Sequence, residues 1–191
     1  MSERPILFSS PMVRAILAGK KTQTRRIVKL PTWADQHEPI EINMAGLPEC
    51  ICIKTGCLSG ICCPYGIPGD RLWVRETHMI HAEEIAYAAT DQPLVGCDKW
   101  RPSIFMPRWA SRITLEVVAV RVERLQDITE HDAELEGAAM CEHFADAKRG
   151  HPLQPHKTAF AWLWNKINGV DSWAANPWVW VVEFKRLEQP K

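Results

Sequence analysis

The sequence contains no apolar run that approaches the roughly 20 residues needed to cross a bilayer. Its first residues, MSERPILFSSP, hold one apolar stretch of four residues, which is too short for the core of a signal peptide. The chain also shows no internal repeat and no low-complexity tract. These absences predict a cytoplasmic protein without a membrane partner.

An excess of charge is missing as well, because 23 lysines and arginines balance 23 aspartates and glutamates. Bulk charge therefore cannot hold a nucleic acid, and any such contact must come from a local patch. Apolar residues make up 46% and charged residues 24%, which is ordinary for a globular domain and argues against disorder. At 191 residues we expect a single domain over residues 1–191.

No C-x-x-C pair occurs among the seven cysteines, and their odd number argues against a disulfide framework. Five of them crowd into CICIKTGCLSGICC, at Cys50, Cys52, Cys57, Cys62 and Cys63. One interpretation is a structural zinc site, because thiolates in a short loop can complete a tetrahedral coordination. The other is a cysteine-rich surface insertion that needs no cofactor. The absence of paired ligand spacings favours the second, and zinc is the weaker alternative.

Hydrophobic patterns predict a few strands separated by short helices. We expect strands at residues 6–8, 72–75, 111–125 and 178–184, and helices at 10–18, 129–136 and 159–167. Two stretches without clear periodicity, about 31–68 and 78–105, are predicted as long loop insertions. Most of the nine tryptophans should lie in the core, with one or two left for a ligand. The strands are too few for a doubly wound sheet, so we predict an α+β fold with a small mixed or barrel-like sheet.

The segment GKKTQTRR, at residues 19–26, follows the first predicted helix. The segment has four cations that are candidates for phosphate contacts, namely Lys20, Lys21, Arg25 and Arg26. Exposure to solvent is the commoner outcome for such charges. A threonine hydroxyl becomes a nucleophile when a base removes its proton, and a lysine can be that base if desolvation lowers its pKa. Lys21 and Thr24 are three positions apart, so they are neighbours on a turn but not on a regular strand. The catalytic interpretation therefore requires the segment to turn here.

Such a reaction also needs an acid, and the helix predicted at 129–136 offers three glutamates: Glu130, Glu134 and Glu136. Glu136 directly precedes Gly137, which is expected to end the helix. The negative end of a helix dipole disfavours an ionised carboxylate, so a buried Glu136 would be suited to donate a proton. A glutamate that faces solvent is the alternative, and the residues alone do not choose among the three.

Four stretches together resemble the ASCH-domain family of the PUA-like superfold: ILAGKKTQTRR, PGDRLWVRE, VERLQDITEHDAELEG and WVWVVEF. More narrowly, the chain is similar to ASCH-like proteins of tailed phages and prophages. The resemblance covers about residues 5–30, 65–77 and 110–187, and leaves both insertions outside. It implies a small PUA-like mixed β-barrel with short helices at the rim and a cleft lined by residues 19–26. Relatives in this superfold bind RNA or read modified bases.

One small bacterial branch of this family hydrolyses the acetyl amide of N4-acetylcytidine to cytidine and acetate. It uses a lysine as proton acceptor, a threonine as nucleophile and a glutamate as proton donor. Lys21 and Thr24 match its ILAG-x-KT-x-T-x-R motif, and Glu136 matches the last residue of ITEHDAELE. The resemblance thus implies an amidohydrolase that acts on an acylated nucleobase or nucleoside, with these three residues as the catalytic set. Because this chain is much longer than the enzymes of that branch, the substrate does not follow from the three residues alone.

We expect substrate contacts from six further residues: Lys20, Arg25, Arg26, Trp73, Arg75 and Glu76. For Arg75 and Glu76 an ion pair at a strand edge is an equal alternative. Two other functions stay open, namely a non-catalytic module that binds RNA or a modified nucleotide, and a phage accessory protein with an inactive cleft. The partner under the first two hypotheses is a modified nucleoside or RNA, in a bacterial cytoplasm or in that of a phage-infected host. The sequence indicates no oligomeric state.

Overall fold

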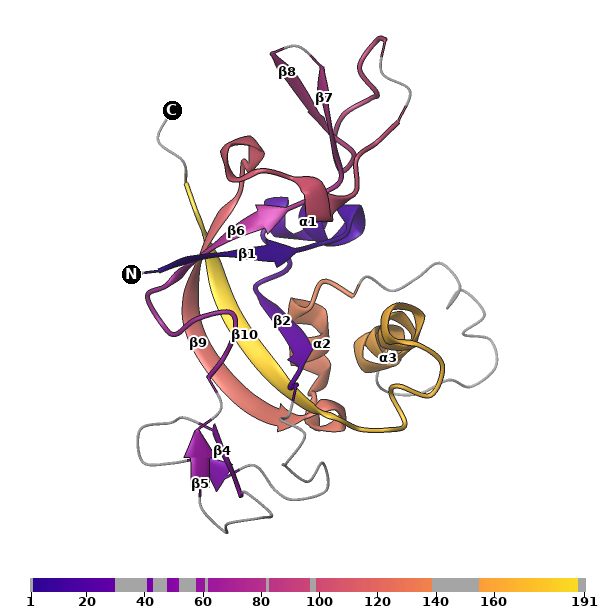
Figure 1. Ribbon diagram of the computed structural model, residues 1–191. Coiled ribbons are helices and arrows are strands. Elements are labelled where there is room, and N and C mark those ends of the chain that lie inside the picture. The colour runs from indigo at the N-terminus through magenta and orange to yellow at the C-terminus, as the bar shows by residue number, and fades with distance from the viewer. Residues whose placement is uncertain are drawn as a thin grey trace, which may run out of the picture. The chain divides into compact units, whose positions relative to one another are not determined.

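The computed structural model describes residues 2–29, 41–42, 48–51, 58–60, 62–81, 83–96, 99–138 and 155–188 (Figure 1). Its strands are β1 (Glu3–Leu7), β2 (Gln23–Ile27), β3 (Glu41–Ile42), β4 (Pro48–Ile51), β5 (Leu58–Gly60), β6 (Arg71–Arg75), β7 (His78–His81), β8 (Glu84–Tyr87), β9 (Thr114–Arg124) and β10 (Trp178–Leu187). Its α-helices are α1 (Ser10–Leu17), α2 (Glu130–Leu135) and α3 (Pro155–Asn168). Three short 3-10 turns are η1 (Ser103–Phe105), η2 (Arg108–Ala110) and η3 (Leu125–Asp127).

The main sheet has the strand order β1-β6-β9-β10-β2. Strand β1 runs parallel to β6, whereas β6 is antiparallel to β9 and β10 is antiparallel to β2. A mixed sheet accompanied by a few helices confirms the predicted α+β class. The closure of this sheet into a barrel stays a prediction.

Two compact units divide the chain. The first unit comprises Met1–Thr22, Tyr65–Val118 and Phe184–Lys191, and the second comprises Gln23–Pro64 and Ala119–Glu183. The long strands β9 and β10 each contribute residues to both units. A single domain over residues 1–191 stays a prediction.

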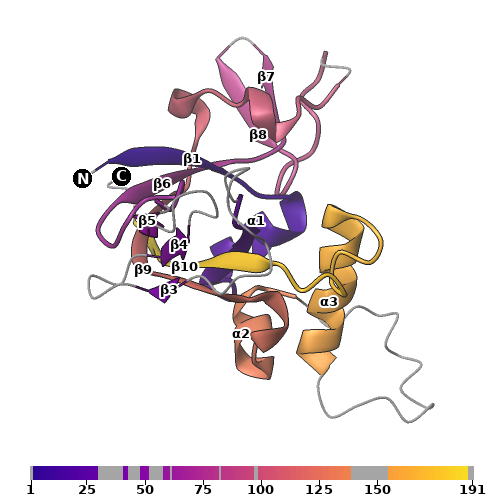
Figure 2. The same ribbon diagram turned by 60° about the horizontal axis from the view of Figure 1, so that its bottom comes forward.

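In the first unit, β1 and β6 lie side by side in both views (Figure 1, Figure 2). Along β6, Leu72 and Val74 are buried and alternate with more exposed residues, as the sequence pattern predicted. Helix α1 buries Val13 and Ile16 on one face. Its N-cap is Ser9, which has the extended backbone that a cap requires.

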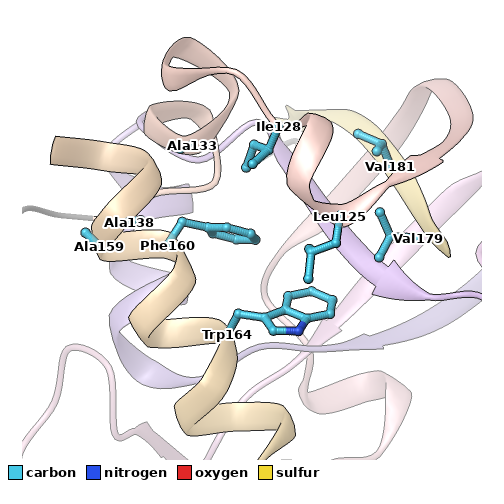
Figure 3. Close-up of a cluster of buried hydrophobic side chains, with 9 residues drawn as sticks. All are labelled: Leu125, Ile128, Ala133, Ala138, Ala159, Phe160, Trp164, Val179 and Val181. Carbon is cyan, nitrogen blue, oxygen red and sulfur yellow. The ribbon is translucent and has the colours of Figure 1, made fainter. Parts of the chain in front are cut away.

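The second unit has its own hydrophobic core between α2, α3 and the sheet (Figure 3). Phe160 and Trp164 project from α3 toward Leu125, and strand β10 contributes Val179 and Val181. Helix α2 begins with a capping pair, because Thr129 Oγ1 accepts the Asp132 N–H and the Asp132 carboxylate accepts the Thr129 N–H.

The two predicted insertions contain regular structure that the sequence patterns did not indicate. The second insertion holds the β7–β8 hairpin, which pairs His78–His81 with Glu84–Tyr87. The first holds an antiparallel sheet of β3, β4 and β5. The prediction of long irregular loops is therefore wrong for these segments.

The prediction that most tryptophans lie in the core holds for some of them only. Trp164 and Trp180 are buried, with 5% and 2% of their surface exposed. Trp109 and Trp162 are exposed to 69% and 48%. Within the described ranges, no helix is long and apolar enough to cross a membrane.

Candidate functional site

The end of α1 positions the first candidate residues, in the first unit. Gly19 adopts the left-handed region with φ of 70°, and its N–H donates to the Ile16 carbonyl at 3.0 Å. The N–H groups of Lys20 and Lys21 both donate to the Ala15 carbonyl, at 2.9 and 3.1 Å. This pattern ends the helix through a glycine and fixes the backbone that follows. Residues 20–22 lie outside helix and strand. The turn between Lys21 and Thr24 that the catalytic interpretation requires stays a prediction.

The Lys21 side chain is buried, with 2% of its surface exposed, whereas Lys20 is exposed. Its Nζ lies 5.6 Å from the centroid of the Phe8 ring, and Phe8 contacts Phe184 at 6.0 Å between ring centroids. Removal of an ammonium group from water favours the neutral amine, which is the form that can accept a proton. The structure therefore separates two adjacent lysines into one buried and one solvated group.

Strand β2, in the second unit, positions Thr24. The strand pairs regularly with β10, with Thr24 opposite Val182. Because side chains alternate along a strand, Thr24 and Arg26 share one face and Gln23 and Arg25 share the other. Thr24 is 3% exposed.

On the opposite face of β2, the Arg25 guanidinium lies among three carboxylates and is itself buried. Its Nη2 lies 2.5 Å from Oε1 of Glu123 and 3.4 Å from Oδ2 of Asp132, and its Nη1 lies 3.2 Å from Oε1 of Glu136. We call these four residues the Arg25 cluster. The sequence predicted a phosphate contact for Arg25, and the structure replaces it with internal ion pairs because the guanidinium is out of solvent and already bonded.

Neighbouring side chains extend the Arg25 cluster. The Gln23 amide donates to the backbone carbonyl of Asp132 at 2.7 Å and to its Oδ1 at 3.1 Å. Arg121 pairs with Glu123, Asp132 and Glu183. Burial acts to raise the pKa of Asp132, but hydrogen bonds from Thr129 and Gln23 and the charge of Arg25 hold that pKa below its ordinary value.

Glu136 is the buried member of the three candidate acids, with 3% of its surface exposed. It follows the last residue of α2, and Gly137 then takes a φ of 72° and ends the helix as predicted. Glu134 is exposed, and the Glu130 carboxylate accepts the backbone N–H groups of His156 and Lys157 at 2.5 and 3.0 Å, at the start of α3. The alternative of a solvent-facing Glu136 is therefore wrong.

The structure joins Glu136 to Arg25, from the β2 face opposite to Thr24. Lys21 belongs to the first unit, whereas Thr24 and Glu136 belong to the second. The convergence of Lys21, Thr24 and Glu136 into one catalytic set stays a prediction.

The remaining predicted contacts lie at the end of β6, in the first unit. Glu76 is 1% exposed, and its two carboxylate oxygens accept from Arg112 at 2.9 and 3.0 Å. The predicted substrate contact of Glu76 is thus replaced by the alternative, an ion pair, although its partner is Arg112 and not Arg75. The Arg75 guanidinium lies 5.4 Å from the ring centroid of the half-buried Trp73.

The cysteine-rich stretch falls largely outside the described residues. Cys52 and Cys57 are not described, and for Cys50 only the backbone is. Cys62 is exposed and Cys63 is buried. Among the described residues, no group of three or more histidine, cysteine, aspartate or glutamate side chains is placed to hold a metal ion. The zinc hypothesis stays a prediction.

No family model matches the chain, and no curated relative matches it in sequence. A similar solved structure is the "High resolution crystal structure of ASCH domain from Lactobacillus crispatus JV V101". The two are 12% identical with a TM-score of 0.41, over 97% of this chain and 79% of that chain.

Proposed function

We propose that this protein is an amidohydrolase that removes an acyl group from a modified nucleobase or nucleoside, with N4-acetylcytidine as its substrate. The observation that carries the proposal is the buried Lys21, at 2% exposure, in the short segment between α1 and the strand β2 that holds the buried Thr24. A lysine taken out of water can act as a base, and a threonine hydroxyl that gives up its proton is a nucleophile. The match of both residues to the enzymatic motif gives the reaction its class.

In this proposal the neutral amine of Lys21 takes the proton from Thr24 Oγ1, and the oxygen attacks the acetyl carbonyl carbon. The bond from that carbon to N4 breaks, and Glu136 donates the proton that the leaving cytidine amine needs. Water then cleaves the acetyl-threonine ester and releases acetate. Arg26, which shares the Thr24 face of β2, is the candidate donor for the oxyanion.

The test is incubation of the purified protein with N4-acetylcytidine, with cytidine and acetate measured by chromatography. We expect turnover by the wild type and a loss of roughly 100-fold or more in Lys21→Ala and Thr24→Ala, because each removes a group that acts in the transition state. Lys29→Ala is the matched control, since Lys29 is an exposed lysine just beyond β2.

Two results would contradict the proposal. One is the absence of cytidine from a folded wild type, with folding checked by circular dichroism. The other is full turnover by Thr24→Ala, which would leave the reaction without its nucleophile.

A further inference from the structure

A second surface of the first unit carries chemistry that the proposed hydrolysis does not use. Residues 99–112, KWRPSIFMPRWASR, include η1 and η2. Two side chains hold this segment to the body of the unit, because Met106 is 1% exposed and Ala110 is 2% exposed. The Met106 sulfur also accepts the backbone N–H of Glu76 at 3.5 Å. We call residues 99–112 the aromatic-basic segment.

The backbone of this segment is well held on both sides of the turns. The N–H and carbonyl of Arg101 both bond to His78, at 2.8 and 3.1 Å. Ser111 Oγ donates to the Val74 carbonyl at 2.8 Å. The side chains that remain outside are therefore presented by a fixed backbone.

Those outside side chains are large and apolar. Ile104 is 56% exposed, Phe105 is 68% exposed and Trp109 is 69% exposed. A folded chain rarely leaves several large apolar side chains in water within six positions unless they contact a partner. Phe105 is the last residue of η1, and Trp109 is the middle residue of η2. Met106, which lies between them in the sequence, is buried.

The charge of the segment selects the kind of partner. Residues 99–112 contain no carboxylate and four cations, namely Lys99, Arg101, Arg108 and Arg112. Lys99 and Arg101 are exposed. Arg108 pairs with Glu3, but the two side chains are 43% and 38% exposed, so a phosphate can compete for that guanidinium. Arg108 also lies 5.8 Å from the ring centroid of the half-buried Trp73.

We propose that the aromatic-basic segment binds single-stranded nucleic acid, with bases stacked on Phe105 and Trp109 and phosphates held by Lys99, Arg101 and Arg108. Flat rings interleaved with cations are the features that hold unpaired bases and their backbone. A duplex hides the faces of its bases, so exposed rings on short turns suit a single strand better. An apolar protein partner would leave the exposed charges of Lys99 and Arg101 without a complement. This binding does not require the chain to hydrolyse an amide.

The experiment is a titration of the full chain into fluorescein-labelled 12-nucleotide single strands of mixed sequence, as RNA and as DNA, followed by anisotropy. We expect the wild type to bind, and the double variant Phe105→Ala with Trp109→Ala to bind at least about tenfold more weakly, because one lost stacking contact alone accounts for roughly that factor. Arg101→Gln should lower the slope of log affinity against log salt by about 0.7, the loss of one phosphate contact. The RNA and DNA arms show which of the two strands is the ligand.

Trp162→Ala is the matched control, because Trp162 is also exposed and lies 4.9 Å from a cation, Lys166, but belongs to α3 of the second unit. It should bind as the wild type does. The proposal is overturned if neither strand binds, or if Trp162→Ala and the double variant lose affinity equally. It is also overturned if the double variant binds normally but loses a concentration-dependent dimer seen for the wild type by light scattering. No step of this test depends on turnover, so a failure of the hydrolysis assay leaves it intact.

Discussion

The ion pairs of Arg25 form the most buried charged arrangement around the candidate site. One guanidinium serves three carboxylates that come from β9, from α2 and from the residue that follows α2. A buried ion pair adds little net stability by itself, but the loss of one partner leaves a charge without compensation in the interior. The arrangement therefore matters chiefly when one member is removed.

We predict that Arg25→Leu lowers the free energy of unfolding by about 3–5 kcal/mol, because three carboxylates lose their shared cation. Arg25→Lys should cost less, since it keeps the charge and loses only the forked geometry. Urea unfolding of both variants measures this, with Lys29→Leu as the control at an exposed cation near the same strand. Equal stabilities of Arg25→Leu and Lys29→Leu would contradict it.

His78 provides a second prediction at this scale. Its ring is fully buried, with Nδ1 3.2 Å from the Glu76 carbonyl and Nε2 without a hydrogen-bond partner. Burial lowers the pKa of His78 below its ordinary value of 6.5, against the Glu76 carbonyl, and the charges of Arg101 and Arg75 add to the lowering.

Because the unfolded chain then binds this proton more readily than the folded chain, the free energy of unfolding falls as pH drops below about 6.5. The slope is at most about 1.4 kcal/mol per pH unit, and the loss is complete below the folded pKa. Urea unfolding between about pH 5.5 and 7.5 should show this slope in the wild type and in His131→Met, whose ring is exposed. A His78→Met variant with the same slope would contradict the assignment.

At the scale of single elements, the turn after α1 links helix termination to the candidate base. Gly19 has open space around an added Cβ, so an alanine there meets no clash and suffers only the cost of the left-handed backbone. Any change of that backbone moves the hydrogen bonds that hold Lys20 and Lys21 to Ala15. The same turn therefore ends α1 and positions the backbone of Lys21.

We predict that Gly19→Ala lowers the free energy of unfolding by about 1–2 kcal/mol. It should also lower kcat for N4-acetylcytidine when kcat is calculated per folded molecule, because the displaced backbone carries Lys21. Gly69→Ala is the control, because Gly69 also has positive φ and open space but lies before β6. Thermal unfolding and turnover of both variants provide the comparison. A Gly19→Ala enzyme with the turnover of Gly69→Ala would show that the turn does not position the base.

Elements with strong local signals were predictable. The Thr129–Asp132 capping pair and Gly137 mark both ends of α2, and the apolar pattern of residues 178–184 marks β10. The β7–β8 hairpin was missed because Ala82 and Glu83 stand between its strands, and neither is a residue that typically forms a tight turn. A hairpin whose loop lacks the residues typical of tight turns is not predicted from the local sequence.

The candidate site was predictable only in its residue types. Burial of Lys21 and Glu136 depends on contacts between segments far apart in the chain, which local patterns do not encode. The role of Arg25 was missed for the same reason, since its partner Glu123 is 98 positions away. The alternation of Gln23 and Arg25 on one face of β2 was a usable signal, because it places both side chains away from Thr24.

For the whole molecule, a formal net charge of +0 conceals an uneven distribution. The first unit holds 13 lysines and arginines against 9 acidic residues, and the second holds 10 against 14. The aromatic-basic segment lies in the basic unit and the Arg25 cluster in the acidic one. Overall neutrality is therefore compatible with a nucleic-acid contact in one unit.

The Arg25 cluster also bears on how this protein changes over evolutionary time. A mutation at any one of its four positions leaves charges at the other positions without compensation, so these positions should be replaced together or retained together in related sequences. Invariance of Glu136 among relatives would then follow from folding alone. Retention of that glutamate is consequently no evidence that it donates a proton, and only turnover measurements can assign it that role.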